Sequence, residues 1–454
     1  MTMSTVLILI AVIAFIVITT ARFKLHPFIS LLLAAFLLSF ASGLPIADIA
    51  KNISNGFGGI LGYIGLVIVL GTIIGGILEK SGAAITMAET VIKILGPRFP
   101  TLTVSIIGYL VSIPVFCDSG YVILNSLKQS LANRMRVSSV AMSVALATGL
   151  YATHTFVPPT PGPIAAAGNL GLEASLGTVI AVGLLVAGCA AIAGLLWANR
   201  FKHELPDGEG AEELLEKAEE FEAMKQRYGA LPGAFNAFAP IFVPILLICL
   251  GSVANFPAEL MGKGALYDVV NFLGQPLNAL FIGLFLSFNL IKGNNRLEQF
   301  SDYIANGLVA AAPILLITGA GGAFGAVIKA TDVGSYLGTA LSGLGIGIFM
   351  PFIVSAALKS AQGSSTVALV TTSALVAPML GDIGLGSEMG HVLTVMAIGA
   401  GAMTVSHAND SFFWVVTQFS KMSVPQAYRA QTMATLVQGV TGMAVVYILS
   451  LVLL

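Results

Sequence analysis

Long apolar runs separated by short polar segments cover almost the whole chain. Because about twenty apolar residues cross a bilayer as a helix, each run predicts a membrane-spanning helix. We expect about twelve such spans, at residues 4–21, 27–42, 58–78, 101–116, 137–152, 173–197, 237–256, 266–290, 303–328, 343–358, 390–405 and 431–454. Two further apolar segments, 117–133 and 362–380, are short or interrupted, and they predict either re-entrant hairpins or additional spans.

Composition supports this interpretation. The 454 residues are 56% hydrophobic and only 9% charged, with a mean hydropathy of +0.93, whereas soluble domains carry about 25% charged residues. Fifty glycines supply the small surfaces that let membrane helices approach closely. The chain is therefore predicted to be an all-α polytopic membrane protein embedded in a lipid bilayer.

Charge and cysteine content argue against a nucleic-acid-binding protein, a disulfide-rich protein and a zinc protein. The formal net charge is −1, without a basic arm for nucleic acid. The three cysteines, Cys117, Cys189 and Cys249, lie in apolar runs, and an odd buried set favours neither a disulfide framework nor a zinc site. Residues 4–20 lack a charged n-region and a small-residue cleavage site, so they predict a retained first span.

One polar stretch divides the chain. Residues 199–230 are rich in Glu and Lys, and Glu212 to Lys225 has the pattern of an amphipathic helix. We interpret the stretch as a solvated loop joining two halves, with a regulatory role as the alternative. The predicted organisation is an N-terminal membrane half (1–198), a cytoplasmic connection (199–236) and a C-terminal membrane half (237–454).

Short loops that carry Lys and Arg predict the orientation, because such loops face the cytoplasm. This places both termini on the periplasmic side and requires an even number of spans. The residues used are Arg22, Lys24, Arg200, Lys202, Lys225, Arg227, Lys292, Arg296, Lys421 and Arg429.

A weak internal repeat relates the two halves. The segment 76–80 resembles 325–329, and after each come a polar break in an apolar run and then a histidine motif. By the charge rule the span ending at Lys80 runs inward and the span ending at Lys329 runs outward. The pattern therefore predicts an inverted-topology repeat, as in many secondary transporters.

The two histidine motifs, 153–163 and 406–411, would break helices inside the membrane. A bilayer tolerates irregular backbone only where protein or water surrounds it. A pair of breaks in corresponding halves indicates a transporter's binding site. The candidates in these motifs are His154, Thr160, Ser406, His407, Asn409 and Asp410.

Several side chains in the apolar segments and the histidine motifs could carry a proton. Ser119 is a candidate for binding the substrate, and Asp118, the residue before it, lies within an apolar segment, where a carboxylate costs about 2.5–3.5 kcal/mol on insertion scales. Desolvation favours its protonated form, which suits proton coupling, and the alternative is capping of a helix. Histidine titrates near neutral pH, so His154 and His407 are further candidates, with bonding to freed carbonyls as their alternative. Asp410 is equally able to cap the following helix.

The second interrupted segment, 362–380, begins with a polar turn. Amide, hydroxyl and backbone N–H groups at the start of a helix suit a carboxylate or hydroxylated ligand. Lys359, one turn earlier, is the candidate cation for a carboxylate, and snorkelling to the surface is its alternative. The turn comprises Gln362, Gly363, Ser364, Ser365 and Thr366.

Some motifs are absent. The chain has no phosphate-binding loop for ATP, no arginine-rich voltage sensor and no zinc-protease or nucleophile-elbow motif. We therefore expect no enzyme activity, no cofactor and no metal.

At these motifs the chain resembles the gluconate permease (GntP) family of the ion transporter superfamily. The family's acidic turn corresponds to 116–118, its Gln-Gly-Ser turn to 362–368, and its Ser-His-x-Asn-Asp-Ser stretch to 406–411, followed by Trp414. Its proline-rich motif is matched by His154, Phe156, Pro158, Pro159, Pro161, Gly162 and Pro163.

The resemblance implies proton-coupled uptake of sugar acids across a bacterial inner membrane. It further implies a homodimer of scaffold and transport domains in which two opposed hairpins move as an elevator. The chain departs from the family at Thr160, where many members carry a second histidine, at Cys117, which replaces an aromatic residue, and at Lys359, often an arginine. These departures make glycerate or D-serine alternatives to gluconate.

The sequence thus predicts a secondary active symporter that imports a small hydroxylated monocarboxylate with protons. We expect Ser364, Ser365, Thr366 and Asn409 to hydrogen-bond the anion, and Asp118, His154, His407 or Asp410 to carry the proton. Sodium coupling stays open, because neutral Ser, Thr and Asn turns also suit sodium. A channel or facilitator and a membrane-embedded enzyme are weaker alternatives.

Overall fold

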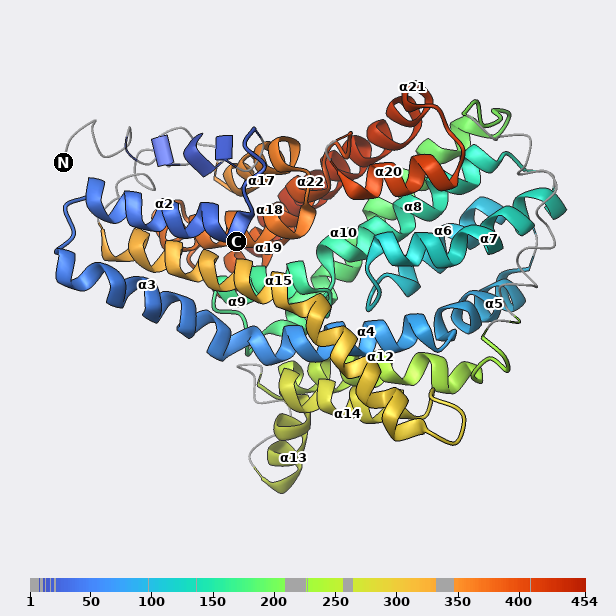
Figure 1. Ribbon diagram of the computed structural model, residues 1–454, viewed down its shortest axis with the longest axis horizontal. Coiled ribbons are helices and arrows are strands. Elements are labelled where there is room, and N and C mark those ends of the chain that lie inside the picture. The colour runs from blue at the N-terminus through green and yellow to red at the C-terminus, as the bar shows by residue number, and fades with distance from the viewer. Residues whose placement is uncertain are drawn as a thin grey trace.

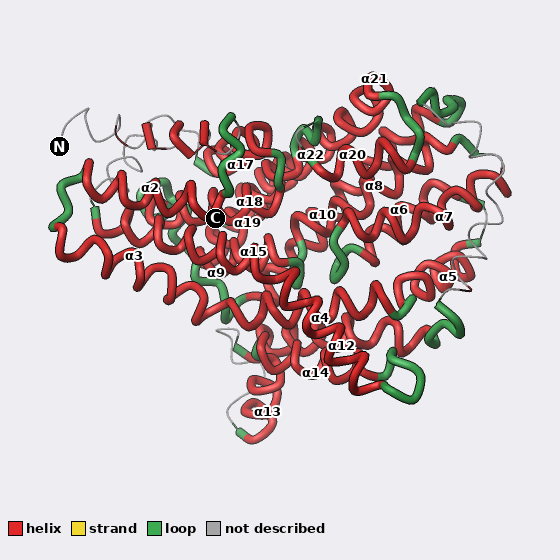
Figure 2. Tube along the Cα trace, viewed as in Figure 1, coloured by secondary structure: helices red, strands yellow, loops and turns green. Residues whose placement is uncertain are grey.

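The computed structural model describes residues 22–96, 98–135, 137–208, 228–255, 264–331, 347–408 and 410–454, together with residue 226 and eight residues between 8 and 19. Within these ranges every regular element is a helix, and no strand occurs (Figures 1 and 2). The prediction of an all-helical protein is confirmed. The predicted amphipathic helix from Glu212 to Lys225 lies outside the described residues.

The N-terminal half contains two kinds of helix, long apolar ones and short ones that end at breaks. A π-helical turn, η1, connects α3 to α4, so that the three form one continuous helical segment, which passes above α12 and α14 in the view of Figure 1. The elements are α2 (Pro27–Ala41), α3 (Ile46–Ile60), η1 (Leu61–Gly65), α4 (Leu66–Lys80), α5 (Ala83–Leu95), α6 (Pro100–Val111), α7 (Cys117–Met135), α8 (Ser139–Phe156), α9 (Pro161–Asn169), α10 (Leu176–Ala198) and η2 (Asn199–Phe201).

The C-terminal half is organised similarly. Its longest helix, α15, has 35 residues and packs along α2, α3 and α4 (Figure 1). The elements are α12 (Ala234–Ala254), α13 (Ala265–Gly274), α14 (Pro276–Phe288), α15 (Arg296–Ala330), α17 (Phe349–Gln362), α18 (Ser365–Val376), η4 (Ala377–Met379), α19 (Glu388–Met403), α20 (Ser411–Phe419), α21 (Val424–Ala427), η5 (Tyr428–Thr432) and α22 (Met433–Leu453).

The expected count of about twelve spans is not confirmed. Five described helices are long and apolar enough to cross a membrane, or seven if each of two bent pairs is one span. The predicted span 266–290 is such a pair, bent by 69° between α13 and α14, where Pro276 cannot donate a backbone hydrogen bond to continue the first helix. The predicted spans 4–21 and 343–358 lie partly outside the described residues.

Both interrupted segments belong to helix pairs joined by short breaks. Helices α6 and α7 are joined through residues 112–116, where the Ser112 hydroxyl donates to the carbonyl of Val115 at 2.9 Å. Helices α17 and α18 meet at Gly363, whose φ of 90° ends α17; glycine adopts this left-handed conformation readily. A broken helix follows each pair: α8 and α9 are separated by residues 157–160, and α19 and α20 by residues 404–410.

The packing of these elements is reciprocal between the halves. Helix α6 packs on α8, and α17 packs on α19 in the same way. The second helix of each pair reaches the other half, since α7 contacts α20 and α18 contacts α9. Each interrupted segment is therefore held against the broken helix of the opposite half.

Glycines permit close helix approach where α3 meets α15. A Cβ atom on Gly56 would lie 2.5 Å from Cβ of Ala326 and 2.6 Å from the carbonyl oxygen of Gly322. By contrast, Gly58 on the same helix has no neighbouring atom within 4 Å of such a position. The contact therefore depends on one glycine and not on the other.

We expect Gly56→Ala to lower the free energy of unfolding by about 1–3 kcal/mol, the usual range for overpacking. Gly58→Ala is the matched control and should leave stability unchanged or slightly higher, because alanine favours the helix. Thermal melting of both variants in one detergent measures the difference. Equal melting temperatures would show that α3 and α15 are not closely packed at Gly56.

Candidate functional site

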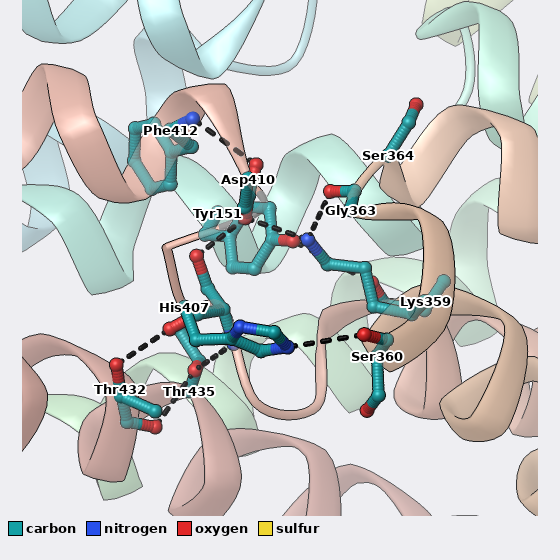
Figure 3. Close-up of polar contacts among 12 residues, drawn as sticks. Tyr151, Lys359, Ser360, Gly363, Ser364, His407, Asp410, Phe412, Thr432 and Thr435 are labelled. Atoms are coloured by element: carbon teal, nitrogen blue, oxygen red, sulfur yellow. Dashed lines mark hydrogen bonds and ion pairs between the residues drawn. The ribbon is translucent and has the colours of Figure 1, made fainter. Parts of the chain in front are cut away.

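A buried ion pair joins the second interrupted segment to the second broken helix. Nζ of Lys359 lies 2.6 Å from Oδ2 of Asp410, and the two side chains are 0% and 6% exposed. Lys359 also donates to the carbonyl of Gly363 at 2.5 Å (Figure 3). The structure thus places Lys359 in the protein interior, so the snorkelling alternative is wrong for this residue.

Asp410 begins helix α20. Its Oδ1 accepts a hydrogen bond from the backbone N–H of Phe412 at 3.0 Å (Figure 3), and Asp is a preferred N-cap residue. The hydroxyl of Ser406 donates to Oδ2 of the same carboxylate. The capping interpretation of Asp410 is confirmed, and its second oxygen faces Lys359.

Hydrogen bonds from neighbouring helices hold the irregular segment 404–410. The Ser406 N–H donates to Oγ1 of Thr435 at 2.9 Å, and the Thr432 hydroxyl donates to the carbonyl of Ser406 at 2.6 Å. Nε2 of His407 lies 3.1 Å from the carbonyl oxygen of Ser360 (Figure 3). Backbone groups freed by the break are therefore satisfied by protein, as a membrane interior requires. Asn409 lies outside the described residues.

Asp118 brings a second carboxylate to the site. It lies in the first turn of α7, which packs on α20. The carboxylate contacts Ser411 and interacts electrostatically with Asp410 and Lys359. Its Oδ1 atom is buried and has no hydrogen-bond partner in the described part of the chain. Two carboxylates and one ammonium group therefore share this site.

Aromatic rings enclose His154 at the end of α8. The imidazole is 4% exposed, stacks on Tyr151 with ring centroids 6.3 Å apart, and lies 6.0 Å from Phe116. Tyr151 also stacks on Phe412 at 5.0 Å, and its hydroxyl is directed toward the Lys359–Asp410 pair (Figure 3). Nδ1 of His154 is buried without a hydrogen-bond partner among the described residues. An imidazole in this state can still donate or accept a proton.

The second turn is largely stabilised by its own side chains. The amide of Gln362 donates to the carbonyl of Ser364 at 2.6 Å and accepts from the Ser364 N–H at 3.0 Å. The Ser364 hydroxyl accepts from Val367 N–H at 3.2 Å, which caps α18. Ser365, in contrast, is buried and lies within hydrogen-bonding reach of the Tyr151 hydroxyl.

The remaining predicted residues differ in where they lie relative to this centre. Thr160, at the N-cap position of α9, donates its hydroxyl to the carbonyl of Val157 at 2.6 Å. A Cβ atom on Gly162 would lie 3.6 Å from Cα of Thr366, so the starts of α9 and α18 pack together. Ser119 faces Glu79, at the end of α4, and not the central cluster.

The structure thus collects Asp118, His154, Ser365, Ser406 and Asp410 around Lys359. Sequence reasoning did not identify Tyr151, Thr432 or Thr435 as members of the site. The position of Tyr151 one turn before His154 was an available signal, since residues three apart share a helix face. Among the described residues no group of three or more His, Cys, Asp or Glu side chains could hold a metal ion.

Apolar helices around a buried cluster of charges, placed where two broken helices meet, define a multi-pass membrane permease. The chain belongs to the GntP family of permeases, whose family model matches residues 3–452. The protein is accordingly a multi-pass protein of the bacterial inner membrane.

Several bacterial transporters are similar to this chain along nearly their whole length. The gluconate permease of Pseudomonas aeruginosa is 34% identical over 98% of this chain and 97% of its own. The D-serine transporter DsdX of Escherichia coli K12 is 33% identical over 97% of each chain. The Gnt-II system L-idonate transporter of Escherichia coli K12 is 29% identical over 98% of this chain and 99% of its own.

A solved structure shares the fold. The YdaH transporter of Alcanivorax borkumensis superposes with a TM-score of 0.67 at 14% identity, covering 94% of this chain and 98% of its own.

Proposed function

We propose that this chain is a secondary active symporter that imports a small hydroxylated monocarboxylate, such as gluconate, together with protons. The observation that carries the proposal is the shared site of Asp118, Asp410 and Lys359. With all three groups ionised the site has one excess negative charge. A substrate carboxylate would add a second negative charge, and an isolated buried charge costs several kcal/mol per ion. A proton on one carboxylate removes this cost, so anion and proton bind together.

Lys359 couples the two ligands in this scheme. In the structure its ammonium is paired with Asp410 at 2.6 Å. Protonation of a site carboxylate releases part of that interaction, and the substrate carboxylate takes its place. The starts of α18 and α20 add partial positive charge. Ser365, Thr366, His154 and Asn409 would bind the substrate's carboxylate and hydroxyl groups.

The relatives support the substrate class. Gluconate, L-idonate and D-serine, named for three relatives, each combine a carboxylate with at least one hydroxyl. This shared chemistry fits an ammonium group surrounded by hydroxyl side chains. Which of these compounds is preferred depends on positions such as Thr160 and Lys359, where this chain departs from the family pattern.

The reciprocal packing of the halves supports alternating access. Helix α7 contacts α20, and α18 contacts α9. The two interrupted segments therefore reach the site from opposite halves of the chain. We propose that these segments form two opposed hairpins of an inverted repeat and move together as the transport domain of an elevator. The proposed assembly is a homodimer with both termini in the periplasm.

The test is uptake of labelled gluconate into proteoliposomes under an inward proton gradient, with and without sodium. An electroneutral one-to-one symporter accumulates substrate about ten-fold for each pH unit, since about 1.4 kcal/mol corresponds to a factor of ten. Glycerate, D-serine and L-idonate as competitors identify the preferred substrate. If gluconate accumulates only when sodium is present, sodium and not the proton is the coupled ion. If gluconate equilibrates without accumulating, the protein is a facilitator.

A further inference from the structure

One face of α7 carries a row of polar side chains leading away from the site. Asp118, Tyr121, Asn125 and Lys128 are spaced three, four and three residues apart, which places them on the same face of a helix. Ten residues of α-helix span about 15 Å. This row therefore leads from the proposed substrate site to Lys128, a buried group to which the proposed symport mechanism gives no role.

Lys128 is buried without an acidic partner. It is 1% exposed, its Nζ donates to the Ser143 hydroxyl at 2.9 Å, and it lies 5.5 Å above the Tyr121 ring. Within the part of the chain that the structure describes, no carboxylate forms an ion pair with it. A permanent, unpaired ammonium in this place would cost several kcal/mol. Membrane proteins keep such groups chiefly where they serve transport.

Hydroxyl and amide groups lie between Lys128 and the site. The Tyr121 hydroxyl contacts Ser143 and lies 2.5 Å from the Ser420 hydroxyl. The Tyr121 ring packs edge-on against Phe412 at 6.2 Å, and the N–H of Phe412 binds Asp410. Between the two ends, Oδ1 of Asn125 is buried and has no hydrogen-bond partner among the described residues. Polar atoms thus follow α7 from Asp118 to Lys128.

The far end of this row faces the predicted cytoplasmic side. Ser138, just beyond α7, donates its hydroxyl to the carbonyl of Glu204 at 2.5 Å. Glu204 follows Arg200 and Lys202, which the charge rule assigns to the cytoplasm. Lys128 accordingly lies between the site and the cytoplasmic surface.

We propose that this face of α7 carries the coupled proton from Asp118 to the cytoplasm, with Lys128 as the acceptor. The inference rests on the proposed proton symport. Asp118 loses a proton, the hydroxyls of Tyr121 and Ser143 each pass one on, and the neutral Lys128 amine becomes an ammonium. Release of that proton to cytoplasmic water restores the amine. A neutral amine accepts as well as donates hydrogen bonds. The Ser143 hydroxyl, which donates to the carbonyl of Ser139 at 2.6 Å, turns toward Nζ of Lys128 to pass its proton on.

Lys128 is the basic side chain of this polar row, and its own contacts are with a hydroxyl and an aromatic ring. The helices packed against α7 carry further titratable groups: Glu79 and Lys80 on α4, Glu89 and Lys93 on α5, Tyr109 on α6, and Tyr151 and His154 on α8. Helix α20 presents Ser411 and Phe412 to α7, and Asp410 precedes it. Nζ of Lys128 contacts Ser143 and Tyr121.

The experiment compares Lys128→Met and Lys128→Arg with wild type in proteoliposomes. Arginine keeps the charge but does not release its proton, so both variants should fail as acceptors. We expect gluconate exchange between equal pools within two-fold of wild type. Accumulation under one pH unit should fall from about ten-fold to about one-fold. Lys51→Met, at an exposed lysine of α3, should change neither.

Tyr121→Phe removes one hydroxyl of the path without touching Lys128, so it tests the same proposal in a variant of nearly unchanged shape. It should slow proton-driven uptake and leave exchange intact. Wild-type accumulation retained by Lys128→Arg, or exchange lost in step with uptake in Lys128→Met and Tyr121→Phe alike, would assign a structural role and overturn the proposal. Wild-type protein that accumulates nothing under a proton gradient would overturn the symport function as well.

Discussion

Replacing Asp118 by asparagine is expected to abolish proton-driven accumulation of substrate while leaving substrate exchange in place. Asparagine has nearly the same shape and can still bond Ser411, but it cannot take up a proton. The site then holds Asp410 and Lys359 as a neutral pair, to which a substrate anion binds without a proton. Accumulation under one pH unit should therefore fall from about ten-fold to about one-fold.

The measurement is initial uptake and steady-state accumulation of labelled gluconate at several external pH values. Asp48→Asn is a suitable control, because Asp48 is an exposed acid in the first turn of α3, just as Asp118 lies in the first turn of α7. Concentrative uptake with an unchanged pH profile in Asp118→Asn would exclude Asp118 as the proton carrier.

The helix breaks at the site were predictable because local chemistry determines them. Helix α8 ends at Phe156 and α9 begins at Pro161, where consecutive prolines remove donors and clash with the preceding turn. Asp410 begins α20 as an N-cap, and Gly363 ends α17 in the left-handed conformation. Each of these boundaries depends on residues within one turn of the break.

The contacts that hold the helix breaks together were not predictable from the sequence, because they depend on tertiary packing. Lys359 and Asp410 are 51 residues apart, and Thr432 and Thr435 reach Ser406 from a different helix. No local pattern fixes such pairs. The span count is not confirmed for a related reason: α3 and α5 are helices with mixed polarity, and apolar runs alone did not reveal them.

The buried pair itself leads to the largest expected change in stability. Lys359→Met leaves Asp410 buried without its cation, and breaking a buried ion pair typically costs about 3–5 kcal/mol. Arg429→Met provides the comparison, because Arg429 and Glu204 also form an ion pair, at 2.5 Å, but are 62% and 34% exposed. An exposed pair contributes about 0–1 kcal/mol. Thermal melting should therefore separate the two variants clearly.

A second substitution distinguishes the stabilising role of Lys359 from its role in binding substrate. Lys359→Met combined with Asp410→Asn removes both charges and keeps an efficient N-cap, since Asn caps helices as well as Asp. Most of the lost stability should return. Gluconate binding and exchange should not return, because the substrate carboxylate would then enter a site with Asp118 and no ammonium group. Exchange restored together with stability would mean that Lys359 only holds the fold, and the substrate anion would have to be bound by helix N-termini and hydroxyl groups alone.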